Sequence, residues 1–196
     1  WYSQAGTPHV KAVGQYDADA GRYTLTLSQS CAATPGQPNK LPFVIPVALG
    51  LLDAQGNALP LQLDGEATAG STERTVVLTE ESLTLGFVNV TSQPVPSLLR
   101  GFSAPVVLDH DYSDTELLTL LAHDGDAFNR WEAGQRLMLR IAINAIADST
   151  ITEGANGQID QNLLPDALVQ AMRAVLRHPQ LDAAFKELVL TLPSES

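Results

Sequence analysis

Residues 106–121, VVLDHDYSDTELLTLL, contain the change of pattern that decides the fold. The apolar, β-branched residues at its start are typical of the last strand of a sheet. Ser113 and Glu116 then form a capping box, in which each side chain satisfies a backbone N–H at the start of a helix. The leucines that follow predict an amphipathic helix. We therefore predict a β-sandwich domain over 1–111 and an all-helical domain over 112–196.

The sequence before this switch has the features of short antiparallel strands. Tyr23, Leu25 and Leu27 alternate with polar residues, so one face of their strand is apolar. Residues 17–21, DADAG, are typical of a turn and join this strand to an earlier one at 10–16. The pattern predicts a β-hairpin at the start of the sandwich.

Prolines mark the middle strands of the first domain. The nearly continuous apolar run at 43–52 predicts a strand covered on both sides. Pro46 cannot donate a ladder hydrogen bond, so we expect this strand at a sheet edge or bulged there. Pro94 and Pro96 interrupt a later stretch. About seven short strands favour an immunoglobulin-like β-sandwich; the others are expected at 74–79, 83–90 and 106–110.

The second half predicts antiparallel helical hairpins. Gly125 ends the first helix and Asp126 caps the second. The second helix carries an apolar stripe at helical spacing, formed by Trp131, Gly134, Met138, Ile141 and Ala145. Gly134 costs about 1 kcal/mol relative to Ala in a helix interior. It would be tolerated if another backbone passes close.

Two more helices follow a polar loop at 149–162. Pro165 suits the first turn of the third helix, and His178-Pro179 ends it. A stripe of Leu181, Phe185, Leu188 and Leu192 predicts the fourth. Stacked helical units need about three repeats. We therefore expect these helices to begin a helical-repeat superhelix, with their last apolar faces unpartnered.

Composition narrows the class of protein. The net charge is −11, from 22 acids and 11 bases, and no cluster of Lys and Arg offers the basic surface that nucleic acid needs. No apolar run approaches the roughly 20 residues that span a bilayer. Cys31 is the single cysteine, which excludes an intrachain disulfide and fits the cytoplasm. No signal peptide is visible, and a start at Trp1 without Met suggests a segment of a longer chain.

The histidines do not have the spacing of a catalytic zinc site. Such a site on a helix needs two His one turn apart, with a Glu between them. The four histidines are His9, His110, His123 and His178, and none lies four residues from another. The most ligand-like cluster is Asp109-His110-Asp111, but alternate side chains of a strand point to opposite faces. A solvated strand end explains this cluster better than a metal site, so we predict no metal ligand.

Two catalytic arrangements can be drawn on paper. His123 with Asp124 and Asp126 resembles a base with its orienting carboxylate, although a helix boundary explains the same residues. Ser113, His110 and Asp109 supply the residue types of a catalytic triad, but without a strained nucleophile turn or oxyanion donors. No glycine-rich stretch has the spacing of a phosphate loop. We predict no catalytic and no cofactor-binding residue in the chain.

Cys31 and the first two residues are the remaining candidates. Cys31 lies in a loop of small residues without a nearby histidine or basic residue in the sequence, which predicts an inert thiol. Trp1 and Tyr2 form either a binding platform or, the reading we favour, a surface buried against a preceding domain.

Five stretches resemble the bacterial aminopeptidase N family of zinc metallopeptidases, which are gluzincin aminopeptidases. They are WYSQAGTP at 1–8, QPVPSLLR at 93–100, FSAP at 102–105, FNRWEAGQ at 128–135 and LTLP at 190–193. The matches occur in order and cover essentially the whole chain. The resemblance is to a middle fragment that spans the family's β-sandwich domain and the start of its C-terminal helical domain.

The resemblance implies that zinc and the catalytic residues belong to a domain upstream of the position matching Trp1. It implies as partners that catalytic domain, the rest of the helical domain and, for the longer protein, peptide substrates. The expected function is a non-catalytic structural segment of an aminopeptidase, linking the catalytic domain to the helical domain that walls the active-site chamber. The alternative is an independent β-sandwich module that binds a glycan or a protein.

Overall fold

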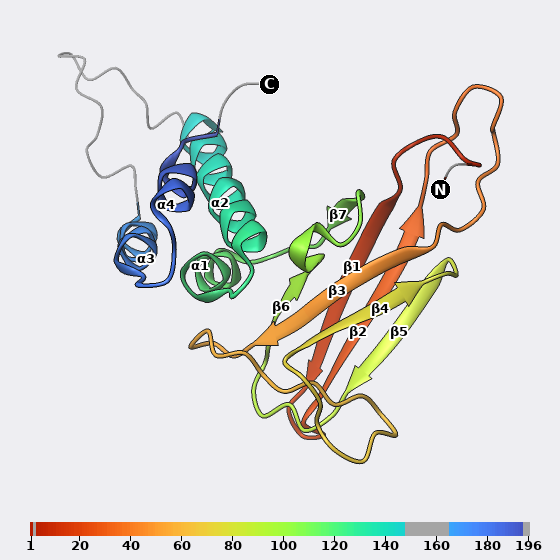
Figure 1. Cartoon of the computed structure of the whole chain (residues 1–196), viewed down its shortest axis with the longest axis horizontal. Helices are drawn as coiled ribbons and strands as arrows, with labels where there is room; N and C mark the ends of the chain where they lie inside the picture. The colour runs from red at the N-terminus through yellow and green to blue at the C-terminus, as the bar shows by residue number, and fades with distance from the viewer. Residues whose placement is uncertain (2, 148–164, 194–196) are drawn as a thin grey trace. The chain divides into compact units, whose positions relative to one another are not determined.

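The computed structural model describes residues 1, 3–147 and 165–193. These residues form two compact units, Trp1–Tyr112 and Ser113–Ser196. Among the described residues, the first unit holds seven strands and the second holds four α-helices (Figure 1). Tyr112 is buried with the first unit, where its hydroxyl donates to the carbonyl of Pro96 at 2.7 Å.

A four-stranded sheet has the order β5-β2-β1-β7. Strands β1 (His9–Asp17) and β2 (Arg22–Ser30) form the predicted hairpin, paired from His9–Ser30 to Asp17–Arg22. The Asp17 carboxylate accepts from the amides of Asp19 and Ala20 and so fixes the turn. The sheet is completed by the antiparallel β5 (Ser82–Phe87) and the parallel β7 (Val107–Asp109).

A three-stranded sheet has the order β4-β3-β6. Its strands are β3 (Ile45–Leu52), β4 (Glu73–Leu78) and β6 (Val95–Leu98). The prediction of an edge strand or a bulge at Pro46 is wrong, because β3 is central and pairs with β4 in continuous register through Pro46. Pro46 is tolerated because β6 pairs with β3 only from Leu49 onward. The amide of Ala48, which faces the same side as position 46, donates to Ser103 Oγ at 3.0 Å instead of to a strand.

The expectation that prolines interrupt the stretch near residue 95 is also wrong. Val95–Leu98 is a strand that contains Pro96, and all four of its residues are buried. Because β6 pairs only with β3, one side of it needs no ladder donor. A proline is compatible with such an edge.

The core of the first unit lies between the two sheets. Alternate residues of β2, namely Tyr23, Leu25 and Leu27, are buried, as the period of two predicts. They join one cluster with the inward residues of β3, such as Ile45, Val47 and Leu49. The sandwich therefore closes its apolar faces against each other.

The first helix, α1 (Asp114–His123), begins as predicted. Ser113 Oγ accepts from the amide of Glu116, and the Glu116 carboxylate accepts from the amide of Ser113. Its end differs slightly from expectation, because the cap residue is Asp124 rather than Gly125.

The second helix, α2 (Ala127–Ala147), packs against α1. Its stripe is buried at Gly134 and Met138 and half-buried at Trp131 and Ile141. Gly134 faces a side chain and not another backbone: a Cβ there would lie 3.2 Å from Cδ1 of Leu121. The close neighbour of this glycine is therefore a leucine side chain and not a second backbone.

The last two helices are α3 (Asp166–Arg177) and α4 (Ala183–Leu190). Pro165 is the residue before α3 and not part of its first turn, and α3 ends before His178 as predicted. The stripe predicted on α4 is not the face that packs in the core, since Leu188 and Leu192 are exposed and Val189 is buried. Leu192 also lies beyond the end of α4. The loop expected at 149–162 lies outside the described residues. None of the described helices combines the length and apolar character that a membrane span requires.

Candidate functional site

The Asp109-His110-Asp111 cluster lies at the end of β7. Its three residues line a pocket of about 480 Å³ together with residues 11–14 of β1. His110 is held in place by its surroundings: Nδ1 lies 2.8 Å from the carbonyl oxygen of Ala12, to which it donates, and the ring stacks edge-on against Tyr112 at 4.2 Å. Asp109 and Asp111 are exposed. The imidazole thus continues the hydrogen bonding along the edge of β1 beyond the last residue pair between β1 and β7.

No group of three or more His, Cys, Asp or Glu side chains is placed to hold a metal ion anywhere in residues 1, 3–147 and 165–193. The described residues therefore do not fit a zinc ion, and we derive no hydrolytic step from them. The contacts of residues 109–111 are those of a strand end.

Ser113, the nucleophile of the triad considered from the sequence, caps the start of α1. Its hydroxyl lies 2.8 Å from a carboxylate oxygen of Glu116 and also accepts from the Glu116 amide. The ring nitrogen Nδ1 of His110 is engaged with a backbone carbonyl. Each residue thus has a structural partner of its own.

Residues 123–126 form the corner between α1 and α2. His123 is exposed, and Asp124 is buried. Asp124 Oδ1 accepts from the amide of Asp126, whose carboxylate in turn accepts from the amide of Asn129 at 2.9 Å. These bonds cap the start of α2, which is the role that the helix-boundary interpretation predicts.

Arg130 locks the same corner, and sequence reasoning missed it. The side chain is only 3% exposed. Its guanidinium donates to the carbonyl of Ala122 at 3.0 Å and twice to the carbonyl of Asp124, at 3.0 and 2.6 Å. Burial lowers the pKa of Arg130, and the charge of Asp124 opposes that shift. The signal was present in the sequence, because Arg130 precedes Ala133 and Leu137 at helical spacing.

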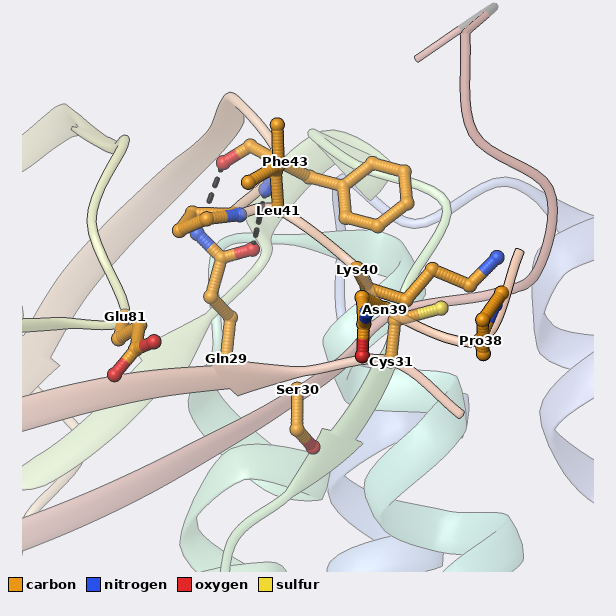
Figure 2. A pocket seen from close by; sticks show the side chains of 10 residues that line it. Gln29, Ser30, Cys31, Pro38, Asn39, Lys40, Leu41, Phe43 and Glu81 are labelled. Atoms are coloured by element: carbon orange, nitrogen blue, oxygen red, sulfur yellow. Dashed lines mark hydrogen bonds between the residues drawn. The ribbon is translucent and has the colours of Figure 1, made fainter. Parts of the chain in front are cut away.

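A second pocket, of about 330 Å³, lies beside Cys31 (Figure 2). The thiol is half-buried, and its sulfur lies 3.9 Å from the carbonyl oxygen of Ala5. The expectation that no basic residue lies nearby is wrong, since Lys40 lines the same pocket. The Lys40 ammonium donates to Ala5 O, Thr34 Oγ1 and Gln37 Oε1, at 2.8, 2.6 and 2.9 Å. Its three donors therefore tie the loop together.

Beside this pocket, glutamine side chains form the backbone hydrogen bonds that a neighbouring strand would otherwise form. Gln29 Oε1 accepts from the amide of Phe43, and Gln29 Nε2 donates to the carbonyl of Phe43 (Figure 2). Gln29 Nε2 also donates to the carbonyl of Glu80. Gln4 grips the amide and carbonyl of Leu41 in the same way, at 2.7 and 3.0 Å. A side-chain amide has the same donor and acceptor as a peptide group. These residues therefore mimic strand pairing where no strand runs.

The first residues of the chain are anchored to the same loop. Gln37 accepts from the amide of Ala5 and donates to the carbonyl of Ser3. The indole N–H of Trp1 donates to the carbonyl of Val44 at 2.8 Å, and its ring contacts Phe43 at 5.1 Å. Trp1 is nevertheless 43% exposed. Tyr2 lies outside the described residues, so the paired aromatic surface stays a prediction.

The structure thus defines a chain with an immunoglobulin-like sandwich followed by a helical-repeat unit. Residues 6–111 match the family described as Domain of unknown function (DUF3458) Ig-like fold, and residues 114–196 match its companion described as ARM repeats. The chain belongs to this family. The fold class predicted from the sequence is confirmed.

Sequence relatives confirm the resemblance to aminopeptidase N. The chain is 40% identical to "Aminopeptidase N" of Escherichia coli and 42% identical to that of Caulobacter vibrioides, over 196 and 195 residues. These alignments cover 99% and 100% of the chain but only 21% and 20% of the relatives. The chain therefore spans about a fifth of the length of the curated relatives it matches.

A solved structure is similar to the chain. The crystal structure of Legionella pneumophila aminopeptidase A in complex with aspartic acid aligns with a TM-score of 0.72 at 26% identity. The alignment covers 97% of this chain and 19% of that one. Both comparisons therefore match the whole chain to a part of a larger aminopeptidase.

Proposed function

We propose that this chain is a non-catalytic structural segment of a zinc-dependent aminopeptidase that releases N-terminal amino acids from peptides. In this proposal the segment links the catalytic domain to the helical domain that walls the active-site chamber. The observation that carries it is the 35–42% identity to aminopeptidases N along the whole chain. Residues 1–111 and 112–196 are the proposed domains, and the cytoplasm is the proposed location.

The contacts described above support a mechanical role. The polar side chains that suggested chemistry, such as His110, Ser113 and Asp124, are each bonded to backbone or to a cap. Glutamine ties hold the start of the chain to the sandwich, and Arg130 fixes the first helical corner. A spacer needs such rigid ends, because a loose connection transmits no orientation.

Activity measurements on two proteins test the first part of the proposal. The longer protein should hydrolyse an aminoacyl-p-nitroanilide, lose that activity with a chelator and regain it with zinc. The 196-residue chain alone should show none of this. Zinc-dependent turnover by the 196-residue chain would contradict the proposal, as would an inactive longer protein.

A linker insertion tests the coupling role. The insertion consists of four residues, Gly and Ser, between Tyr112 and Ser113 of the longer protein. It should lower kcat/KM for peptides more than for the small reporter, because only peptides fill the chamber. The same insertion at the exposed turn of Gly65 is the control, since a side chain there would meet nothing within 4 Å. Equal effects of the two insertions would argue against coupling, and a saturable glycan ligand would favour the binding-module alternative.

A further inference from the structure

An apolar groove lies between the start of α2 and the middle of α4. Its volume is about 300 Å³. The lining residues are all apolar: Ala127, Phe128, Trp131, Phe185 and Leu188. The rings of Phe128 and Trp131, one helical turn apart, are tilted at 43° with centroids 5.8 Å apart. All of these residues belong to α2 and α4 of the helical unit. Both helices are labelled in Figure 1.

The groove has a firm frame but no lid among the described residues. Gln135 of α2 donates to the carbonyl of Thr191 at 2.9 Å and holds the end of α4 beside α2. Val189 anchors α4 in the core with no exposed surface, whereas Leu188 is 50% exposed and Phe128 37%. The side chains of Leu188 and Phe128 therefore do not contribute to the unit's own core. They face outward from helices that are fixed in place.

We propose that a helix from the remaining part of the longer protein covers this groove with apolar side chains. This inference rests on the proposed function, since it requires that the chain is part of a larger protein. The relatives are about five times as long as the chain. The second unit matches ARM repeats, and units of this kind bury their apolar faces against neighbouring helices.

The chemistry of the lining selects this occupant. None of the five lining residues carries a charge or a hydrogen-bonding group other than the Trp131 indole. A charged or extended peptide would lose hydration there without a polar partner in return. An amphipathic helix instead inserts aliphatic side chains spaced three or four residues apart, which matches the spacing of Phe128 and Trp131.

Amide hydrogen exchange of α4 provides the test. The segment 183–190 should exchange at least roughly tenfold more slowly in the longer protein than in the 196-residue chain, because a covering helix stabilises it locally. Leu188→Gln should remove most of that difference in the longer protein and leave exchange in the 196-residue chain unchanged. The matched control is Leu139→Gln on α2, which is 51% exposed and outside the groove.

Three outcomes would overturn the inference. The first is equal exchange of 183–190 in the two proteins, and the second is an exchange rate of 183–190 in the longer protein that Leu188→Gln does not change. The third is protection in the 196-residue chain that depends on its concentration, which would identify a second copy as the occupant. Aminopeptidase activity is measured in parallel on the longer protein. Slowed exchange without activity would contradict the proposed function alone, and activity without slowed exchange would contradict the groove alone.

Discussion

The β-sandwich unit and the helical unit treat their apolar residues differently. The sandwich packs one continuous core between two sheets. The helical unit is the smaller of the two, yet among the residues that the structure describes it carries half of the exposed large apolar ones. In that unit they are Phe128, Leu139, Ile143, Leu176, Leu188, Leu190 and Leu192. A sandwich supplies its own second layer, whereas stacked helical hairpins bury their faces only against neighbours.

The largest expected effect is the loss of a core side chain from the sandwich. Leu25 is completely buried, so Leu25→Ala should destabilise the first unit by about 2–5 kcal/mol through lost transfer energy and a residual cavity. Leu188→Ala should change the stability of the second unit by less than about 0.5 kcal/mol, because the side chain is half exposed. Urea unfolding measures both free energies.

The two tryptophans allow the units to be followed separately. Trp1 contacts Phe43 in the sandwich and Trp131 lies in α2, so Trp131→Phe and Trp1→Phe each leave a single fluorescent reporter. A loss of similar size from Leu25→Ala and Leu188→Ala would erase the contrast between the units.

Arg130 tests whether the helical unit depends on one polar residue more than on its exposed leucines. Arg130→Met should destabilise that unit by about 2–3 kcal/mol, because it leaves the carbonyls of Ala122 and Asp124 without their donors. The control is Arg140→Met, which removes a solvent-exposed ion pair to Asp114 and should cost less than about 1 kcal/mol. Thermal unfolding followed by Trp131 fluorescence measures both effects. Equal loss of stability in the two variants would contradict the prediction.

Gly14 tests how tightly the sandwich core is closed. Val10 and Ala12 are buried on β1, and Gly14 continues their row where the ring of Tyr23 fills the space of a side chain. Gly14→Ala should cost about 1–3 kcal/mol from overpacking. Gly70→Ala is the matched control, since its Cβ would meet only an ordinary contact at 3.6 Å from the carbonyl oxygen of Leu61. Calorimetry that gave the same melting temperature for both variants would show a looser core.

The smallest expected effect is a pH dependence in a sandwich loop. The amide of Leu63, and after it the guanidinium of Arg74, hold the pKa of Glu66 below its ordinary value of 4.5. The folded state therefore favours the carboxylate, and this contribution is present above that value and lost as the pH falls through the lower folded pKa.

Glu66→Gln should accordingly reduce the loss of stability that acid causes in the sandwich. Urea midpoints between about pH 6 and pH 3 measure it. Glu80→Gln removes one carboxylate from an exposed turn and serves as the control. A pH profile of Glu66→Gln parallel to that of the original chain would contradict the prediction.

Local patterns predicted most of the elements, and the errors share one cause. The hairpin of β1 and β2 and the capping box of α1 follow from neighbouring residues, and both are confirmed. Pro46 predicted an edge strand or a bulge, because the sequence does not show how far β6 extends along β3. The stripe on α4 was misplaced because a short helix carries apolar residues on several sides, and only the neighbours decide which side is buried.

The residues that fix the two units were harder to foresee. The ties of Gln4 and Gln29 to backbone groups join residues 37 and 14 positions apart, and glutamine has no positional signature for that role. The position of Arg130 on the apolar face of α2 can be read from helical spacing, but the acceptors of its guanidinium cannot. Only the assembled corner shows that it donates three hydrogen bonds to two carbonyls.

The sequence by itself determined the order of the units, the point at which strands give way to helices and the resemblance to one family. These features depend on periodicity and caps, which act over a few residues. The tertiary structure alone decided which strand is central, which side of α4 is buried and which polar side chains are bonded. Those outcomes depend on contacts between residues far apart in the chain, whose hydrogen bonds and buried surfaces exist only after the chain has folded.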